Sequence, residues 1–256
     1  MSTIPLLEGY SEKKVLVSPQ QQIDNFIKNH KSKIKSLPSR CILAGMNPKR
    51  IEIELVKTWS LKEEIWLSQS KNGQPIKIYE KNKEKMVFTH GGGIGAPALC
   101  DRLELLIALG VKEVYLIGMC GGIQRNLKIG DIIAVTDAIR DEGFSYHYLK
   151  SSEKAKASKN MMNLIKNTKL NTRFGTVWTT DTMYRETISK YKKYKNQGVL
   201  GIDMETASAY AVAQYRKINM ISLLIVSDIT HPNEWNPQFH SNLIEKSVNK
   251  IIDNVF

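Results

Sequence analysis

The sequence predicts a single α/β domain built around a mixed β-sheet. Short apolar segments alternate with longer segments of helical character along most of the chain, which is typical of α/β layering. The chain has 256 residues, 42% of them hydrophobic, and is therefore long enough to bury one large core. No repeat or low-complexity run divides it. We therefore take residues 1–39 as an N-terminal extension that packs on the domain, and residues 40–256 as the domain itself.

The first half of the domain is expected to contain two buried strands, a hairpin and a helix. Residues 40–45 (RCILAG) and 85–90 (KMVFTH) are short, apolar and bounded by glycine or turn residues, as buried strands are. Between them, residues 65–80 (IWLSQSKNGQPIKIYE) predict a hairpin that turns at Asn72-Gly73, a pair that tolerates positive φ angles. Residues 96–110 carry apolar side chains on one broad face, and Gly110 stands where a C-terminal helix cap is expected.

The second half continues the alternation. Strands are expected at 113–118, 131–139, 173–181, 199–204 and 220–228, and helices at 184–198, 205–217 and about 241–253. In open α/β sheets, ligands bind where the carboxyl ends of strands meet. Four polar or glycine-rich stretches fall at such ends: THGGGIGAP (89–97), GMCGG (118–122), DMET (203–206) and SDITH (227–231). Their convergence predicts a binding site at this edge of the sheet.

Composition excludes several classes of protein. The formal net charge is +12, but the lysine runs lack interleaved aromatic residues and no nucleic-acid fold signature is present, so they predict a solvated surface and no nucleic-acid partner. Cys41, Cys100 and Cys120 are widely spaced and odd in number, which predicts no disulfide framework, no metal site and a reducing cytoplasm. Without an apolar run of spanning length or a signal-peptide pattern, no membrane partner is expected.

Two acidic residues lie at predicted strand ends. Glu205, directly after Met204, either interacts with the positive end of the following helix or accepts hydrogen bonds from a vicinal diol, as ribose recognition requires. Asp228 ends an apolar strand and is either an N-cap or a functional acid. Burial would suit such an acid to proton donation.

The pairing of GVLGIDMETASAYAVA with LLIVSD resembles the nucleoside phosphorylase-I family, and so do the segments GGGIGAPALCDRLELLIALGVKEVYLIGMCGG and GTVWTTDTMYRET. The similarity covers roughly residues 40–250. The resemblance implies a three-layer α/β/α sandwich around a mixed, partly barrel-like sheet, assembled as a homo-oligomer (a dimer or a hexamer).

The resemblance also implies a site and a reaction. Glu205 would bind the ribose hydroxyls beside Met204, Asp228 would protonate purine N7, and Met183 and Tyr184 would contact the base. The implied reaction cleaves the N-glycosidic bond of a nucleoside with inorganic phosphate as co-substrate and no cofactor, giving the free base and a pentose 1-phosphate. A purine is favoured, because the Gln/Arg pair that uridine phosphorylases use for uracil is not found here, and a uridine phosphorylase stays open as an alternative.

The phosphate site departs from the family pattern. Leu116 and Met119 stand where the phosphorylases place Arg and Ser or Thr, and neither side chain offers a hydrogen-bond donor. Phosphate binding then depends on Arg50, as the best surviving ligand, and on a set of weaker candidates. These are Gly45, His90, Met119, Cys120 and Gly121.

Two alternatives to phosphorolysis stay open. One is a nucleosidase that hydrolyses a nucleoside or an AMP-like nucleotide, since the segment GMCGGIQRNLKIGD is closer in sequence to AMP nucleosidase than to the phosphorylases. The other is a non-catalytic storage or binding relative, which the joint presence of Glu205, Met204 and Asp228 disfavours. After Asp228, residues 232–239 (PNEWNPQF) are expected to form a flap, with Trp235 and Phe239 as packing residues.

Overall fold

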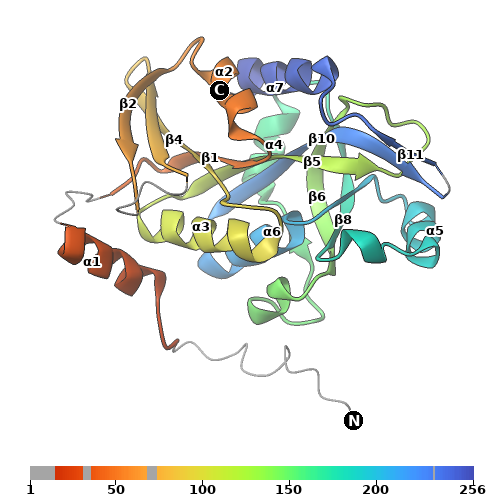
Figure 1. Cartoon of the computed structure of the whole chain (residues 1–256), viewed down its shortest axis with the longest axis horizontal. Helices are drawn as coiled ribbons and strands as arrows, with labels where there is room; N and C mark the ends of the chain where they lie inside the picture. The colour runs from red at the N-terminus through yellow and green to blue at the C-terminus, as the bar shows by residue number, and fades with distance from the viewer. Residues whose placement is uncertain (1–14, 31–35, 68–73, 233) are drawn as a thin grey trace.

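The computed structural model describes residues 15–30, 36–67, 74–232 and 234–256, and within them eleven strands form one mixed sheet (Figure 1). The strands are β1 (Arg40–Gly45), β2 (Ser60–Ile65), β3 (Ile76–Lys81), β4 (Glu84–His90), β5 (Glu113–Gly122), β6 (Ile132–Asp141), β7 (Ala155–Lys156), β8 (Arg173–Thr180), β9 (Gly201–Asp203), β10 (Asn219–His231) and β11 (Glu234–Pro237). The α-helices are α1 (Pro19–His30), α2 (Pro48–Leu55), α3 (Ala96–Ala108), α4 (Lys159–Lys166), α5 (Ile188–Asn196), α6 (Thr206–Arg216) and α7 (Asn242–Val255), and two 3₁₀ turns span Phe144–His147 and Met183–Arg185.

Part of the sheet closes on itself. The strand order is β11-β10-β6-β8-β9-β5-β1-β4-β3-β2, and β10 also pairs with β5, so β5, β10, β6, β8 and β9 form a ring. Parallel pairs (β1 with β4 and β5, β5 with β10, β8 with β6 and β9) alternate with antiparallel ones. The predicted α/β domain with a mixed, partly barrel-like sheet is confirmed.

Helices cover the sheet on two sides. In Figure 1, α2 and α7 lie above it and α3 and α6 below it, and the members of each pair contact one another. Helix α6 is buried from Thr206 to Ala213, because its alanines and other small side chains let it pack closely against its neighbours. Helix α1 contacts α3. No helix in the described part of the chain is long and apolar enough to cross a membrane.

The glycine-rich stretch at 118–122 belongs to a strand that was expected to end at Gly118. Strand β5 continues to Gly122, because β10 pairs beside it through Asp228↔Gly121 and Ile229↔Gly122, and β9 pairs on the other side. A Cβ atom on Gly121 would lie 3.1 Å from an Asp228 carboxylate oxygen. The glycine therefore allows the close approach of β5 and β10.

Other differences concern element ends. The helix expected at 184–198 begins only at Ile188, because the Thr187 side chain caps it by accepting a hydrogen bond from the Lys190 N–H. Strand β10 runs three residues past Asp228, to His231, since β11 pairs with its end. Helices α1, α2 and α4 were not expected. Of the hairpin expected over residues 65–80, β3 falls within that range except for its last residue, whereas its antiparallel partner β2 already ends at Ile65. The turn expected at Asn72-Gly73 lies outside the described residues.

Candidate active site

A cavity of about 370 Å³ opens at the ends of β5, β9 and β10. It brings together side chains that are more than 100 residues apart in the sequence. Its walls are made by Gly45, Ile94, Met119, Cys120, Gly121, Met183, Tyr184, Glu186, Ile202, Asp203, Met204, Glu205, Ser227, Asp228, Thr230, Trp235 and Phe239. Of the residues that sequence analysis predicted for the site, all but Arg50 and His90 line this cavity.

Asp228 lies on β10 with its side chain held from three directions. The Ser227 hydroxyl donates to Oδ1 at 2.9 Å, the Thr230 hydroxyl donates to Oδ2 at 3.1 Å, and the indole N–H of Trp235 donates to Oδ2 at 2.9 Å. Asp228 is only 8% exposed. These donors fix the orientation of a buried acid toward the cavity, as catalysis of a proton transfer requires.

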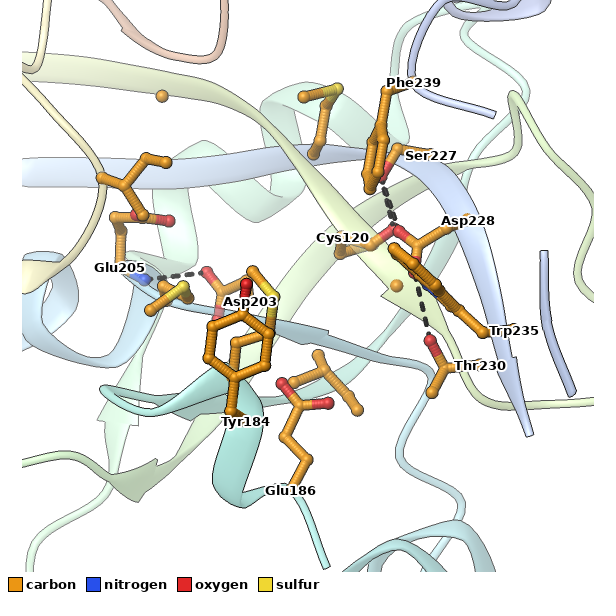
Figure 2. A pocket seen from close by; sticks show the side chains of 17 residues that line it. Cys120, Tyr184, Glu186, Asp203, Glu205, Ser227, Asp228, Thr230, Trp235 and Phe239 are labelled. Atoms are coloured by element: carbon orange, nitrogen blue, oxygen red, sulfur yellow. Dashed lines mark hydrogen bonds between the residues drawn. The ribbon is translucent and has the colours of Figure 1, made fainter. Parts of the chain in front are cut away.

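Glu205 stands opposite Asp228 in the view of Figure 2. It is the N-cap residue of α6, and its Oε1 accepts a 2.7 Å hydrogen bond from the Gly95 N–H. Asp203, on β9, accepts hydrogen bonds from the Thr206 N–H at 2.8 Å and the Thr179 hydroxyl at 2.6 Å. Burial, together with the neighbouring Asp203 carboxylate, raises the pKa of Glu205 above its ordinary value. The Asp203 side chain, and not that of Glu205, therefore caps α6, and the Glu205 carboxyl group lines the cavity.

Glu186 is a cavity residue that sequence analysis did not single out. Its side chain lines the cavity and lies below Tyr184 and Asp228 in the view of Figure 2. Burial, followed by the nearby Asp228 charge, raises the pKa of Glu186 to about 7. The signal that could have found it is an acid directly after the TTDTMYR segment, which sequence analysis already associated with the base.

Apolar side chains make up much of the remaining wall. Met183 and Tyr184, from the 3₁₀ turn, line the cavity and are 47% and 95% exposed, so Tyr184 stands at its rim. Met204 is half-buried beside Glu205. Trp235 and Phe239, expected only to pack, line the cavity as well, and their rings are 6.2 Å apart.

The predicted phosphate ligands are divided. Gly45, Met119, Cys120 and Gly121 line the cavity, whereas Arg50 Nη2 lies 3.5 Å from Nδ1 of His240 and His90 Nδ1 accepts a hydrogen bond from the Gly92 N–H at 3.2 Å. Burial and the nearby Arg102 lower the pKa of His90, which favours the neutral imidazole.

The charge of the cavity wall is one-sided. Among the described residues that line it, four are carboxylates, Glu186, Asp203, Glu205 and Asp228, and none is Lys or Arg. Leu116 is 1% exposed, and its Cδ1 would lie 3.1 Å from a Cβ on Gly45, so an apolar side chain fills the space beneath that edge of the cavity. Within the described chain, no group of three His, Cys, Asp or Glu residues is arranged to hold a metal ion.

Comparison with known proteins agrees with this architecture. Residues 39–256 match the family model of the phosphorylase superfamily. A DeoD-type purine nucleoside phosphorylase of Buchnera aphidicola subsp. Schizaphis graminum is 34% identical over 155 residues, which cover 59% of this chain and 65% of that relative. A DeoD-type purine nucleoside phosphorylase of Buchnera aphidicola subsp. Acyrthosiphon pisum is 29% identical over 180 residues, 68% of this chain and 75% of the relative.

Solved structures show the same fold. A purine nucleoside phosphorylase from Toxoplasma gondii in complex with immucillin-H superposes with a TM-score of 0.72 at 20% identity, covering 86% of this chain and 90% of that chain. A uridine phosphorylase from Vibrio fischeri superposes with a TM-score of 0.69 at 21% identity, covering 87% and 94% of the two chains. The family match spans nearly all of the domain, and the ring-closed sheet agrees with it. This chain therefore belongs to the phosphorylase superfamily.

Proposed function

We propose that the protein cleaves the N-glycosidic bond of a purine nucleoside, with inorganic phosphate as the acceptor, giving the free base and a pentose 1-phosphate. The observation that carries the proposal is that Asp228 and Glu205, contributed by different elements, wall the same largely apolar cavity. The DeoD-type relatives are purine nucleoside phosphorylases by name, which supports the choice of a purine.

The proposed chemistry follows from charge. As the bond between C1′ and the base nitrogen breaks, its electron pair passes to the base, and Asp228 delivers a proton to N7. Glu205 accepts hydrogen bonds from the ribose hydroxyls and so fixes the sugar that develops positive charge. An oxygen of the acceptor then bonds to C1′. Met204, Met183 and Tyr184 contact the sugar and the base.

We propose that Glu186 forms hydrogen bonds with the far edge of the base. Its carboxyl group lies in the cavity near Asp228, and no hydrogen bond from another described side chain occupies it. A half-buried carboxyl group with a pKa of about 7 exchanges between a hydrogen-bond donor and an acceptor near neutral pH. Such a group suits the ring nitrogens and exocyclic groups of a purine.

Hydrolysis of the same bond is a second candidate function, and one observation favours it. Phosphate is an anion, yet the described wall of the cavity holds four carboxylates and no Lys or Arg. Buried anion sites are ordinarily made by Arg, Lys or several backbone N–H groups. Water would need no such cation.

The test is base release from inosine, adenosine, guanosine, uridine and AMP, each with and without inorganic phosphate. Phosphate-dependent release from a purine nucleoside, with ribose 1-phosphate formed, is the expected result. Release at the same rate without phosphate would establish the hydrolase instead, and a preference for uridine would remove the purine assignment. If no substrate releases its base, the chain is a non-catalytic relative and both functions are wrong.

We further propose that the protein forms a homo-oligomer, a dimer or a hexamer, in the cytoplasm. Tyr184 at the rim of the cavity is 95% exposed, so an aromatic side chain beside the site remains available for a partner subunit to cover. Light scattering at several protein concentrations tests this directly, and a monomer at every concentration would contradict it.

A further inference from the structure

A second cavity, of about 670 Å³, lies on the other side of the β10–β11 hairpin from the candidate active site. Helix α5 provides half of its wall, and the β10–β11 hairpin and a residue after β5 provide the rest. In Figure 1, α5 and this hairpin lie at the same end of the molecule. The lining residues are Arg125, Tyr191, Lys192, Lys195, Asn196, His231, Pro232 and Glu234.

The charge of this cavity is opposite to that of the first. Three cations, Arg125, Lys192 and Lys195, face it together with a single carboxylate, Glu234. None of the three cations takes part in an ion pair with another described residue. Like charges gathered in a concave surface raise the local concentration of an anion, since field lines converge there.

The back of the cavity is a hydrogen-bonded wall. The phenol oxygen of Tyr191 and Nδ1 of His231 share a hydrogen bond of 2.7 Å, and Lys195 Nζ donates to the same phenol at 3.0 Å. Tyr191 is only 7% exposed. The hydrogen bond to a buried side chain thus restricts the motion of the Lys195 ammonium group, which lowers the entropy cost of binding an anion.

The β10–β11 hairpin lies between the two cavities, and its successive residue pairs line one cavity and then the other. Thr230 pairs with Trp235 across the strands, and both donate to Asp228 in the first cavity. The next pair, His231 and Glu234, lines the second cavity. Because successive strand residues point to opposite faces, one short hairpin forms a wall of both.

We propose that the second cavity binds a small molecule that carries one or more phosphate groups. Three unpaired cations against one carboxylate leave a surplus of positive charge, which a phosphate dianion or a pyrophosphate group neutralises. The volume, about 670 Å³, is in the range of small-molecule sites and exceeds what one phosphate ion fills. The proposal concerns a site apart from the cavity of Asp228 and does not rest on the proposed reaction.

The experiment is isothermal titration of the full chain with inorganic pyrophosphate at low salt. Lys192→Gln removes one cation without touching Tyr191, and Lys195→Gln removes a second. Lys193→Gln is the matched control, because Lys193 lies on the same helix, is exposed and does not line the cavity. We expect saturable binding that each cavity variant weakens about tenfold and the control leaves unchanged.

Three results would overturn the proposal. One is the absence of pyrophosphate binding at millimolar concentration by a chain whose melting curve is intact. Another is equal weakening by Lys193→Gln, which would mean a diffuse effect of surface charge. The third is binding that Lys192→Gln and Lys195→Gln leave unchanged but that a nucleoside displaces, which would place the anion in the cavity of Asp228.

Discussion

Three donors that hold the Asp228 carboxylate come from a stretch of only nine residues, 227–235. The strand and the hairpin after it therefore carry both the acid and the groups that orient it. A side chain held in this way loses little freedom when a ligand binds, as the proposed proton transfer requires.

Replacement of Asp228 by Asn tests the acid itself. The amide keeps the size of the side chain but has no acidic proton to give, so we expect kcat for base release to fall by roughly 10²- to 10⁴-fold. Binding of the purine nucleoside, measured by titration, should change far less. Turnover equal to that of the original chain would remove Asp228 from the mechanism.

Glu186→Gln has a pH-dependent effect on stability whose sign follows from its pKa. The pKa of Glu186 is raised from 4.5 to about 7. Between these values the folded chain holds a proton that the unfolded chain has released, so this residue makes stability fall as pH rises from about 4.5 to 7. The Gln variant lacks that loss. It should be more stable than the original chain at pH 8, by on the order of 1 kcal/mol, and should gain little or nothing at pH 4.5.

Thermal unfolding of both chains across this range measures the difference. A gain that is the same at pH 4.5 and pH 8 would mean that Glu186 does not titrate as assigned. The same variant is expected to alter the preference among inosine, adenosine and guanosine, because it changes the hydrogen-bonding pattern offered to the base.

At the scale of elements, the β10–β11 hairpin links the acid to the outer rim of the cavity. Trp235, on β11, is 59% exposed yet reaches back to Asp228 through its indole N–H. The indole on β11 therefore contacts an acid that lies on the neighbouring strand, β10. Trp235 is thus a positioning residue in the proposed mechanism.

Trp235→Phe keeps an aromatic ring and removes the N–H donor. We expect kcat to fall about tenfold with little change in KM, since one charge-assisted hydrogen bond is lost. Trp66→Phe is the matched control: Trp66 also donates its indole N–H to a carboxylate, that of Glu64 at 2.7 Å, but does not line the cavity.

A kcat for Trp235→Phe equal to that of the original chain would show that the indole only packs. A loss of the same size in Trp66→Phe would point to a general effect on folding. The two variants together separate positioning from stability.

Local pattern was enough to predict most strands, and tertiary pairing decided where they end. The apolar runs of β1, β4 and β10 are visible in the sequence, because a buried strand must be apolar on both faces. The extension of β5 through Gly121 could not be predicted, since it depends on the approach of Asp228 from a strand about 100 residues away. Glu186 was missed for the same reason: its significance comes from the cavity and the neighbouring Asp228.

At the scale of the whole molecule, the net charge is positive, whereas the charged side chains around the candidate active site are acidic. The chain carries a formal charge of +12, which alone would predict an anionic substrate. The basic side chains are instead gathered elsewhere, as in the cavity beside α5, while the described wall around Asp228 holds four carboxylates and no Lys or Arg. Within a few ångströms of a bound ligand, the nearest charges dominate its electrostatic energy.

This arrangement predicts discrimination against nucleotides. A 5′-phosphate would add about two negative charges to a substrate that enters a cavity lined by Glu186, Asp203, Glu205 and Asp228. We therefore expect kcat/KM for inosine to exceed that for inosine 5′-monophosphate by at least tenfold, a difference that shrinks as salt screens the repulsion. Both rates can be followed by release of hypoxanthine at low and at physiological ionic strength. A preference for the nucleotide would mean that a cation outside the described wall, from Arg50 or from a partner subunit, reaches the 5′ end, and the chain would then resemble AMP nucleosidase in its choice of substrate.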